Sequence, residues 1–153
     1  MTDLIVFSDV HFDESNYGQV LGQLCHERRI YFFHTPIYGV ASCATYMIKK
    51  ADDDSLTIIQ PYVPHDLSPY EQKNAFNKII HQVMDEENIE EYTIWTNTSK
   101  VMPHLRTLTP DSLIYDSNFD YAFSNPELER ELRRKADLVL TSGTFTLSHP
   151  ATC

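Results

Sequence analysis

Asp3-Leu4-Ile5-Val6-Phe7-Ser8 is an apolar run of β-forming residues close to the N-terminus. Four successive apolar residues leave no polar face, so the run predicts a strand that is buried on both sides of its sheet. A polar loop over residues 9–16 follows it directly. Strands buried on both faces are typical of parallel sheets covered by helices, and this stretch therefore predicts an α/β domain.

Strand and helix patterns alternate along the rest of the chain. We expect strands over residues 30–34, 56–60, 92–96, 112–116 and 137–141, and helices over residues 17–29, 69–87, 100–108 and 126–135. Ser68 is the expected N-cap of the second helix, with Pro69 at its first position. The strands before Pro36 and Pro61 should stop there, because proline cannot donate to the ladder. Short connections between alternating elements predict one three-layer domain over residues 1–153, with a mostly parallel sheet.

Two segments do not fit this alternation. In residues 37–54, the stretch 44–48 is either a strand or part of an excursion, and Asp52-Asp53-Asp54 predicts a turn. The last ten residues carry no complete helix or strand pattern. We therefore expect the chain to be the truncated N-terminal part of a longer protein.

Composition excludes several classes of function. The 22 acidic and 12 basic residues give a formal net charge of -10, which argues against a nucleic-acid partner. The N-terminus shows no signal or transit peptide, which predicts a cytoplasmic protein. Three cysteines without a CxxC pair predict no structural metal, and the absence of G-x-G-x-x-G after the first strand predicts no dinucleotide cofactor. The basic residues of the 126–135 helix alternate with glutamates, which is typical of a solvated face.

Chemistry-bearing residues follow four of the expected strands. In open parallel sheets, ligands bind beyond the carboxyl ends of the strands. The candidates are Asp9, His11 and Phe12 after the first strand, Thr98 in the Thr96-Asn97-Thr98-Ser99 loop, Asp116, Asn118 and Phe119 after the next strand, and Gly143 after the last. Thr98 is also suited to capping the helix that follows, and Gly143 to a tight turn. Carboxylates, amides and aromatic rings together suit sugar hydroxyls and the apolar faces of sugars.

Ser8-Asp9-Val10-His11 also permits a metal-dependent reading. It resembles the Asp-x-His opening of calcineurin-like metallophosphoesterases, in which both side chains bind a metal. That family requires further Gly-Asp, Gly-Asn-His and Gly-His-x-His segments. The four glycines of this chain are followed by none of those residues, so the phosphoesterase is the minor alternative.

Several of the strand segments, taken together, resemble the N-terminal half of bacterial GT-B glycosyltransferases of the family 4-like type. The match is carried by residues 3–8, by residues 29–38 with Pro36 after a polar pair, and by residues 113–116 and 134–143. The family usually has His-Leu-Arg-Trp and Arg-Pro-Gln-His after its first strand, whereas Asp9-Val10-His11-Phe12 and Gly18-Gln19-Val20 stand here. Some relatives are associated with UDP-galactopyranose mutase, but the flavin-binding glycine motif of that enzyme is absent.

This resemblance implies a Rossmann-like domain that binds a sugar acceptor, with the nucleotide-sugar donor held by a C-terminal domain that this chain lacks. The implied reaction is sugar transfer to a glycan or lipid-linked acceptor in cell-envelope polysaccharide synthesis, and the isolated domain should be inactive. Asp9 or His11 would act as general base, and the other candidates would bind the sugar. The alternative from a different class is a non-catalytic α/β interaction module, whose exposed apolar face would associate with another chain or with a second copy.

Overall fold

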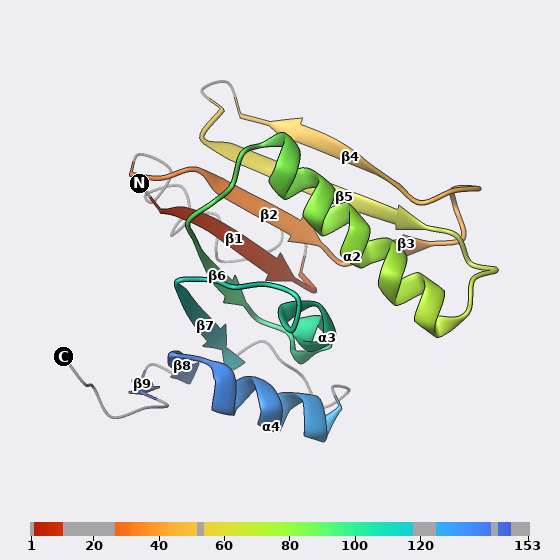
Figure 1. Cartoon of the computed structure of the whole chain (residues 1–153). Coiled ribbons are helices and arrows are strands. Elements are labelled where there is room, and N and C mark those ends of the chain that lie inside the picture. The colour runs from red at the N-terminus through yellow and green to blue at the C-terminus, as the bar shows by residue number, and fades with distance from the viewer. Residues whose placement is uncertain (1, 11–26, 52–53, 118–124, 142–143, 148–153) are drawn as a thin grey trace.

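One nine-stranded sheet forms the centre of the domain. The computed structural model describes residues 2–10, 27–51, 54–117, 125–141 and 144–147 (Figure 1). The strands are β1 (Asp3–Ser8), β2 (Ile30–His34), β3 (Ile37–Tyr38), β4 (Thr45–Lys50), β5 (Leu56–Val63), β6 (Tyr92–Thr96), β7 (Ser112–Asp116), β8 (Leu138–Thr141) and β9 (Thr144–Leu147). The helices are α2 (Pro69–Glu86), the 3₁₀ turn η2 (Ser99–Val101), α3 (Met102–Leu105) and α4 (Pro126–Lys135).

The order of the parallel strands confirms the predicted fold class. β5, β2, β1, β6, β7 and β8 lie side by side and every adjacent pair among them is parallel. The chain moves outward from β1 to β2 and β5, and then returns to place β6 on the other edge of β1. This is the order of a doubly wound, Rossmann-like sheet, with its reversal point between β1 and β6.

The three described α-helices pack on one face of the sheet. Ile5 and Phe7 of β1 share a buried cluster with Phe76 of α2, Met102 of α3 and Leu132 of α4. Leu4, Val6, Ile30 and Phe32 form a second buried cluster on the opposite face. The helix predicted over residues 17–29 lies mostly outside the described residues, and its described end, residues 27–29, is not helical.

The α2 helix begins and ends as local chemistry dictates. Ser68 caps it as predicted, because its Oγ accepts from the Glu71 amide while the Glu71 carboxylate accepts from the Ser68 amide. At the other end, the Ile89 amide donates to the Met84 carbonyl, and Asn88 takes a positive φ of 53°. The apolar stripe predicted from spacing is buried as Phe76, Ile79, Ile80, Val83 and Met84.

The prediction that a strand ends before Pro61 was wrong, since β5 continues to Val63. The Ser55 carbonyl accepts from the amide of Ile30 in β2, and the Val63 carbonyl accepts from the amide of Gly39. The odd-numbered residues of β5 therefore direct their backbone groups toward β2 and β3. Pro61 therefore places its missing N–H at the break between β2 and β3. There Gln60 Nε2 donates to the Thr35 carbonyl at 3.1 Å, and a side chain supplies the bond that the backbone lacks.

The two segments that the sequence left open contain antiparallel strands. β4 pairs with β5 along Thr45–Lys50, so the strand alternative for that segment is the correct one. β9 pairs with β8, whereas no further strand was expected. Its Thr-Phe-Thr-Leu sequence consists mostly of β-forming residues, which explains the pairing.

The helix expected over residues 100–108 is much shorter. η2 covers Ser99–Val101 and α3 ends at Leu105. Pro103 lacks an N–H, and Thr107 Oγ1 donates to the His104 carbonyl at 2.8 Å, so local bonds replace the ladder that a longer helix would need.

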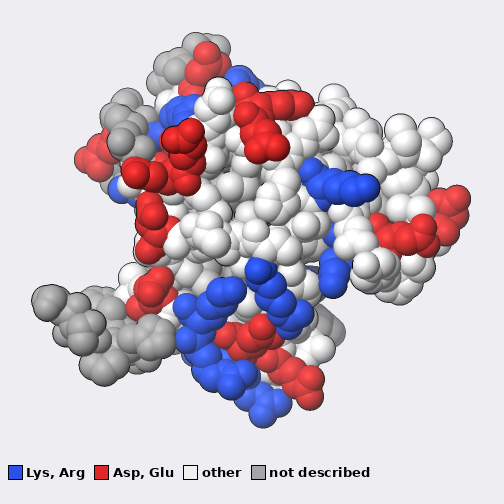
Figure 2. Space-filling model, viewed as in Figure 1, with Lys and Arg blue, Asp and Glu red and all other residues white. Residues whose placement is uncertain are grey.

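The surface agrees with the interpretation of the α4 charges as a solvated face. Arg133 pairs with Glu129, and Arg106 of the preceding segment pairs with Glu131. Figure 2 shows basic and acidic side chains intermixed over α4. None of the helices that the structure describes is long and apolar enough to cross a membrane.

A buried carboxylate joins three elements at the amino edge of the sheet. The Asp3 side chain is 6% exposed, and Arg29 donates to both of its oxygens, at 2.9 and 2.6 Å. Arg29 Nη1 also donates to the Glu87 carbonyl at the end of α2, at 3.0 Å. One guanidinium thus links β1, the start of β2 and the carboxyl end of α2, where a positive charge is favourable.

We predict that Arg29→Leu lowers the free energy of unfolding by roughly 2–3 kcal/mol in urea denaturation, because it leaves a buried carboxylate unpaired. The matched control is Arg133→Leu, which also removes a guanidinium 5.6 Å from a tyrosine ring but otherwise breaks only an exposed i,i+4 pair, and should cost about 1 kcal/mol or less. Equal losses in the two variants would contradict this role for Arg29.

Candidate functional site

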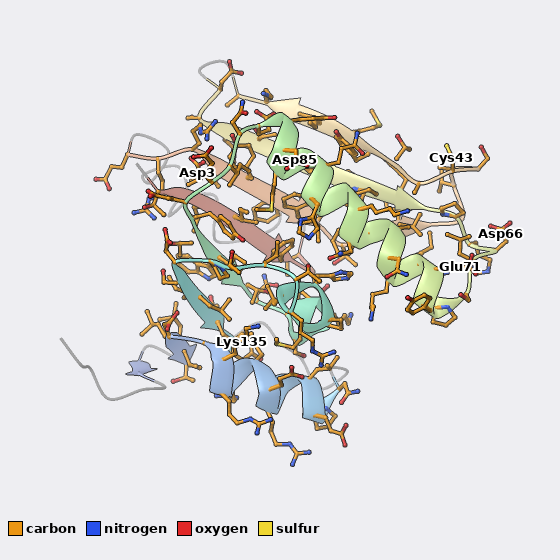
Figure 3. The ribbon with its side chains drawn as sticks, viewed as in Figure 1. Asp3, Cys43, Asp66, Glu71, Asp85 and Lys135 are labelled. Atoms are coloured by element: carbon orange, nitrogen blue, oxygen red, sulfur yellow. The ribbon has the colours of Figure 1, made fainter. Side chains whose placement is uncertain are left out.

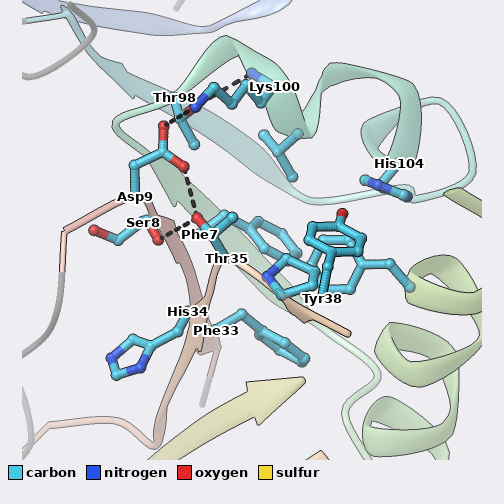
Figure 4. A pocket seen from close by; sticks show the side chains of 13 residues that line it. Phe7, Ser8, Asp9, Phe33, His34, Thr35, Tyr38, Thr98, Lys100 and His104 are labelled. Atoms are coloured by element: carbon cyan, nitrogen blue, oxygen red, sulfur yellow. Dashed lines mark hydrogen bonds and ion pairs between the residues drawn. The ribbon is translucent and has the colours of Figure 1, made fainter. Parts of the chain in front are cut away.

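A pocket of about 250 Å³ opens at the carboxyl ends of β1, β2 and β6, where the strand order reverses (Figure 4). Doubly wound sheets bind ligands at this edge, and the sequence analysis placed its candidate residues there for that reason. Its lining residues come from four segments: Phe7, Ser8 and Asp9; Phe33, His34, Thr35, Pro36 and Tyr38; Phe76; and Thr98, Lys100, Val101 and His104.

The carboxylate of Asp9 is the acidic group of this pocket. Thr35 Oγ1 donates to Asp9 Oδ1 at 2.6 Å, and Lys100 Nζ lies 3.4 Å from Asp9 Oδ2. The Asp9 side chain is 29% exposed and that of Lys100 is 60% exposed. The carboxylate is therefore held by two partners yet remains accessible to a ligand from solvent.

Asn97 fixes the backbone that carries Asp9. Its Nδ2 donates to Ser8 Oγ at 2.8 Å, and its Oδ1 accepts from the Asp9 amide at 3.1 Å. Asn97 is only 1% exposed, so these bonds form in a buried setting where an unpaired group would be costly. The end of β6 thereby sets the position of the first residue after β1.

Thr98 acts as the cap that its sequence context suggested. Its Oγ1 accepts from the Lys100 amide at 3.2 Å and its side chain begins η2. Thr98 is 4% exposed and belongs to the pocket lining. The capping turn also directs Lys100 toward Asp9.

Aromatic side chains form much of the remaining wall. The rings of Phe7 and Phe33 lie 5.2 Å apart, and Phe76 and Tyr38 contribute two more faces. Gly39, with φ of 87°, follows Tyr38, so a residue with a side chain would be strained at that turn. Apolar walls with a few polar groups at one side are the usual composition of small-molecule sites.

His104 is the buried titratable group of the pocket. It is 7% exposed, and its ring packs edge-on against Phe76 with centroids 4.6 Å apart. Its Nδ1 has no hydrogen-bond partner among the residues described. Burial, aided by the positive charge of Lys73, lowers the pKa of His104 to about 4. The imidazole is therefore neutral at pH 7.

The predicted site residues separate into three groups. Asp9 and Thr98 lie together on the pocket lining. Asp116 is 4% exposed at the end of β7, on the same sheet edge but outside that lining. His11, Phe12, Asn118, Phe119 and Gly143 lie outside the described residues.

Sequence reasoning missed Thr35, Lys100 and His104. The rule that located the other candidates, polar residues directly after a strand, also applies to Thr35, which follows β2. Lys100 and His104 fell within a predicted helix and carried no separate signal. Their shared position depends on the short η2–α3 turn.

The described part of the chain offers no set of metal ligands for the phosphoesterase interpretation. No group of three or more His, Cys, Asp or Glu side chains suited to a metal ion occurs there. Asp9, the first residue of the proposed Asp-x-His pair, has an ammonium group beside it instead. Its partner His11 lies outside the described residues.

Comparison with known proteins shows a shared fold but no match in sequence. Neither a protein-family model nor a curated protein sequence matches the chain. Solved structures do match in shape. An α,α-trehalose-phosphate synthase (UDP-forming) from Burkholderia xenovorans, in complex with glucose-6-phosphate, aligns at TM-score 0.53 and 11% identity, over 92% of this chain and 40% of that chain.

Two further structures agree. The corresponding synthase from Burkholderia vietnamiensis aligns at TM-score 0.52 and 13% identity, over 91% of this chain and 39% of that one. A trehalose-6-phosphate protein from E. coli, bound with UDP-2-fluoro glucose, aligns at TM-score 0.52 and 12% identity. The alignment covers 90% of this chain and 39% of that one. The chain has the Rossmann-like fold of a GT-B domain. Identities this low show the fold alone, and the chain spans about two-fifths of these structures.

The low pKa of His104 predicts a pH-dependent stability. Below pH 6.5, the unfolded chain takes up a proton on this histidine that the folded chain excludes until about pH 4. The contribution of His104 to stability should therefore fall by about 2 kcal/mol between pH 7.5 and pH 5. The measurement is the free energy of unfolding in urea, at both pH values, for wild type and His104→Leu. The wild type should lose about 2 kcal/mol more than the variant between pH 7.5 and pH 5.

Val101→Ala is the matched control, since Val101 also lines the pocket but has no titratable group. This variant should lose some stability at both pH values and retain the pH-dependent difference of the wild type. A His104→Leu variant with the wild-type difference would contradict the assigned pKa.

Proposed function

We propose that this chain is the acceptor-binding N-terminal domain of a GT-B glycosyltransferase of the family 4-like type. It would serve the transfer of a sugar from a nucleotide-sugar donor to a glycan or lipid-linked acceptor in cell-envelope polysaccharide synthesis. The fold supports this proposal, because its structural neighbours include two UDP-forming synthases, one of them in complex with glucose-6-phosphate, and an E. coli structure bound with UDP-2-fluoro glucose.

The composition of the pocket is the observation that carries the proposal. Asp9, Thr35 and Thr98 contribute a carboxylate and two hydroxyl-bearing side chains to a pocket that is also lined by Tyr38, an aromatic residue that is 45% exposed. Carboxylates and hydroxyls match the hydroxyl groups of a sugar, and aromatic faces match its apolar C–H face. The sequence-based candidates Asp116, Asn118, Phe119, Phe12 and Gly143 remain part of this proposal as substrate-binding residues.

Asp9 is the proposed general base. As the acceptor oxygen bonds to the anomeric carbon of the donor, the bond from that carbon to the nucleotide phosphate breaks and the proton of the acceptor hydroxyl passes to Asp9. His11, two residues further along the sequence, is the alternative base. The short bond from Thr35 Oγ1 holds the carboxylate at a fixed position, which favours an oriented approach of the acceptor.

The donor would be held by a second, C-terminal Rossmann-like domain. The chain covers 39–40% of its structural neighbours, which supports a division of the whole enzyme between this domain and another. On this proposal, residues 1–153 bind an acceptor sugar but transfer nothing alone, and no mutase activity resides in this domain.

The second candidate is a non-catalytic interaction module, favoured by exposed apolar side chains on β4 and in the preceding turn. Val40 is 73% exposed, Met47 64% and Ile48 39%. β4 is also an edge strand whose outer side has no partner among the described strands. Exposed apolar edges of this kind associate with other chains or with copies of themselves.

The acceptor proposal predicts that sugars, rather than nucleotides, stabilise this chain. A sugar at 100 times its Kd should raise the melting temperature by roughly 5–10 °C. UDP and GDP should cause no shift, and UDP- and GDP-sugars should bind no more tightly than the free sugar. Asp9→Asn should weaken sugar binding by roughly 10- to 100-fold, because it removes a charged acceptor. Thermal-shift titrations with simple sugars, UDP- and GDP-sugars and Mn²⁺ measure both effects.

Asp85→Asn is the matched control, because Asp85 is exposed near the end of α2 remote from the carboxyl edge of the sheet (Figure 3). It should bind sugars as the wild type does. Stabilisation by Mn²⁺ that Asp9→Asn abolishes would instead favour the phosphoesterase. The absence of any shift, together with a dimeric mass in sedimentation, would favour the interaction module.

A further inference from the structure

β4 is the outermost strand on one side of the sheet (Figure 1). The odd-numbered residues of β5 bond to β2 and β3, so its even-numbered residues direct their backbone groups toward β4. Met47 of β4 lies opposite Gln60, and the odd-numbered residues of β4 therefore bond to β5. The N–H and C=O groups of Tyr46, Ile48 and Lys50 point outward instead, and no described strand pairs with them.

We propose that this edge pairs with the same edge of a second copy of the chain, so that the two β4 strands run antiparallel about a two-fold axis at Ile48. The two sheets would then form one continuous sheet, with α2 of both copies on the same face. Such a contact uses the same residues on both copies and closes at a dimer. This inference goes beyond the proposed sugar site and does not depend on it.

The lysines at the end of β4 restrict the register of this pairing. A two-fold axis at Lys49 or Lys50 would place two lysines directly opposite one another, which is unfavourable. An axis at Ile48 places Lys50 opposite Tyr46 of the second copy, and Lys49 opposite Met47. The two Lys50 residues of the dimer then lie roughly 14 Å apart along the strands, beyond the screening length of about 8 Å at physiological salt.

The charges at the end of α2 complement the axis at Ile48. Tyr46 Oη donates to Glu86 Oε2 at 2.5 Å, so the Glu86 carboxylate lies beside the residue that Lys50 of the second copy would face. Glu86 is exposed and forms no ion pair with another described residue. Lys50 lies 2.9 Å from Glu87 of its own chain and is 38% exposed, so it could contact both carboxylates. An axis one residue earlier would move it away from Glu86.

The same register covers two exposed apolar side chains. Ile48, which is 39% exposed, would meet Ile48 of the second copy on the face that carries α2. Met47 is 64% exposed on the other face, where the methylene chain of Lys49 from the second copy can cover it. Because the contact is only one strand wide, we expect a weak dimer with a Kd of roughly 50–500 μM.

Sedimentation equilibrium of the chain, from about 10 μM to about 1 mM, tests for the dimer. The average mass of the wild type should rise toward twice that of one chain. Ile48→Lys should raise the Kd at least about tenfold, because it places like charges at the axis and removes the apolar contact. The matched control is Val40→Lys, which adds the same charge at a residue that is 73% exposed and precedes β4. It should dimerise as the wild type does.

A charge exchange tests the predicted ion pair. Lys50→Glu should weaken the dimer by about three- to tenfold, because the new carboxylate would face Glu86 of the second copy. Adding Glu86→Lys to the same chain should restore the dimer, since the pair re-forms with its charges reversed.

Amide hydrogen exchange of the wild type, followed by NMR, tests the pairing without any variant. In dilute solution, the amides of Tyr46, Ile48 and Lys50 should exchange fast, whereas those of Met47 and Lys49 are protected by β5. At high concentration the three outward amides should become protected too. This alternation is specific to a strand added at the edge of β4.

Two results would overturn the proposal. A chain that stays monomeric up to about 1 mM would leave this edge open to a different protein. A dimer that survives Ile48→Lys, or that leaves the outward amides of β4 unprotected, would show that the copies meet at another surface. Neither result bears on sugar binding, which the thermal-shift titrations measure separately.

Discussion

β1 has hydrogen-bonded strands along both edges and packed side chains on both faces, and all six of its residues are buried. No polar ligand can therefore be contacted from within this strand, and chemistry must begin where it ends. Asp9 is the first residue beyond that limit, at the place where β2 and β6 end beside β1. The position of the pocket follows from this constraint more than from any single contact.

Two polar groups at opposite ends of β1 hold it in register. At the amino end, Asp3 is paired with Arg29, which also reaches the carboxyl end of α2. At the carboxyl end, Asn97 bonds both Ser8 and the amide of Asp9. Both groups are buried or nearly so, and both join elements far apart in sequence. The apolar faces of a parallel strand fix its side-chain alternation, while these polar bonds fix its longitudinal position.

The pocket has two chemically different sides. Near Asp9, the carboxylate accepts from the Thr35 hydroxyl and pairs with the Lys100 ammonium group, in partial contact with solvent. Near His104, a neutral imidazole lies among aromatic rings with one nitrogen unpaired. The proposed sugar, which has hydroxyl groups on an apolar frame, would match this division between a polar and an apolar side.

The sequence by itself determined the fold class and part of the site. Continuous apolar runs and helical stripes are local patterns, and the alternation of β1, α2 and β6 with the Ser68 cap could be predicted from them. Asp9 and Thr98 were found because the ends of parallel strands always share an edge. Only the tertiary structure decided that β5 continues past Pro61, because a side chain from Gln60 and the break between β2 and β3 make that proline tolerable. It also brought Thr35, Lys100 and His104 to Asp9, since contacts among four separate segments depend on strand order and on a turn too short to show in the helical pattern of the sequence.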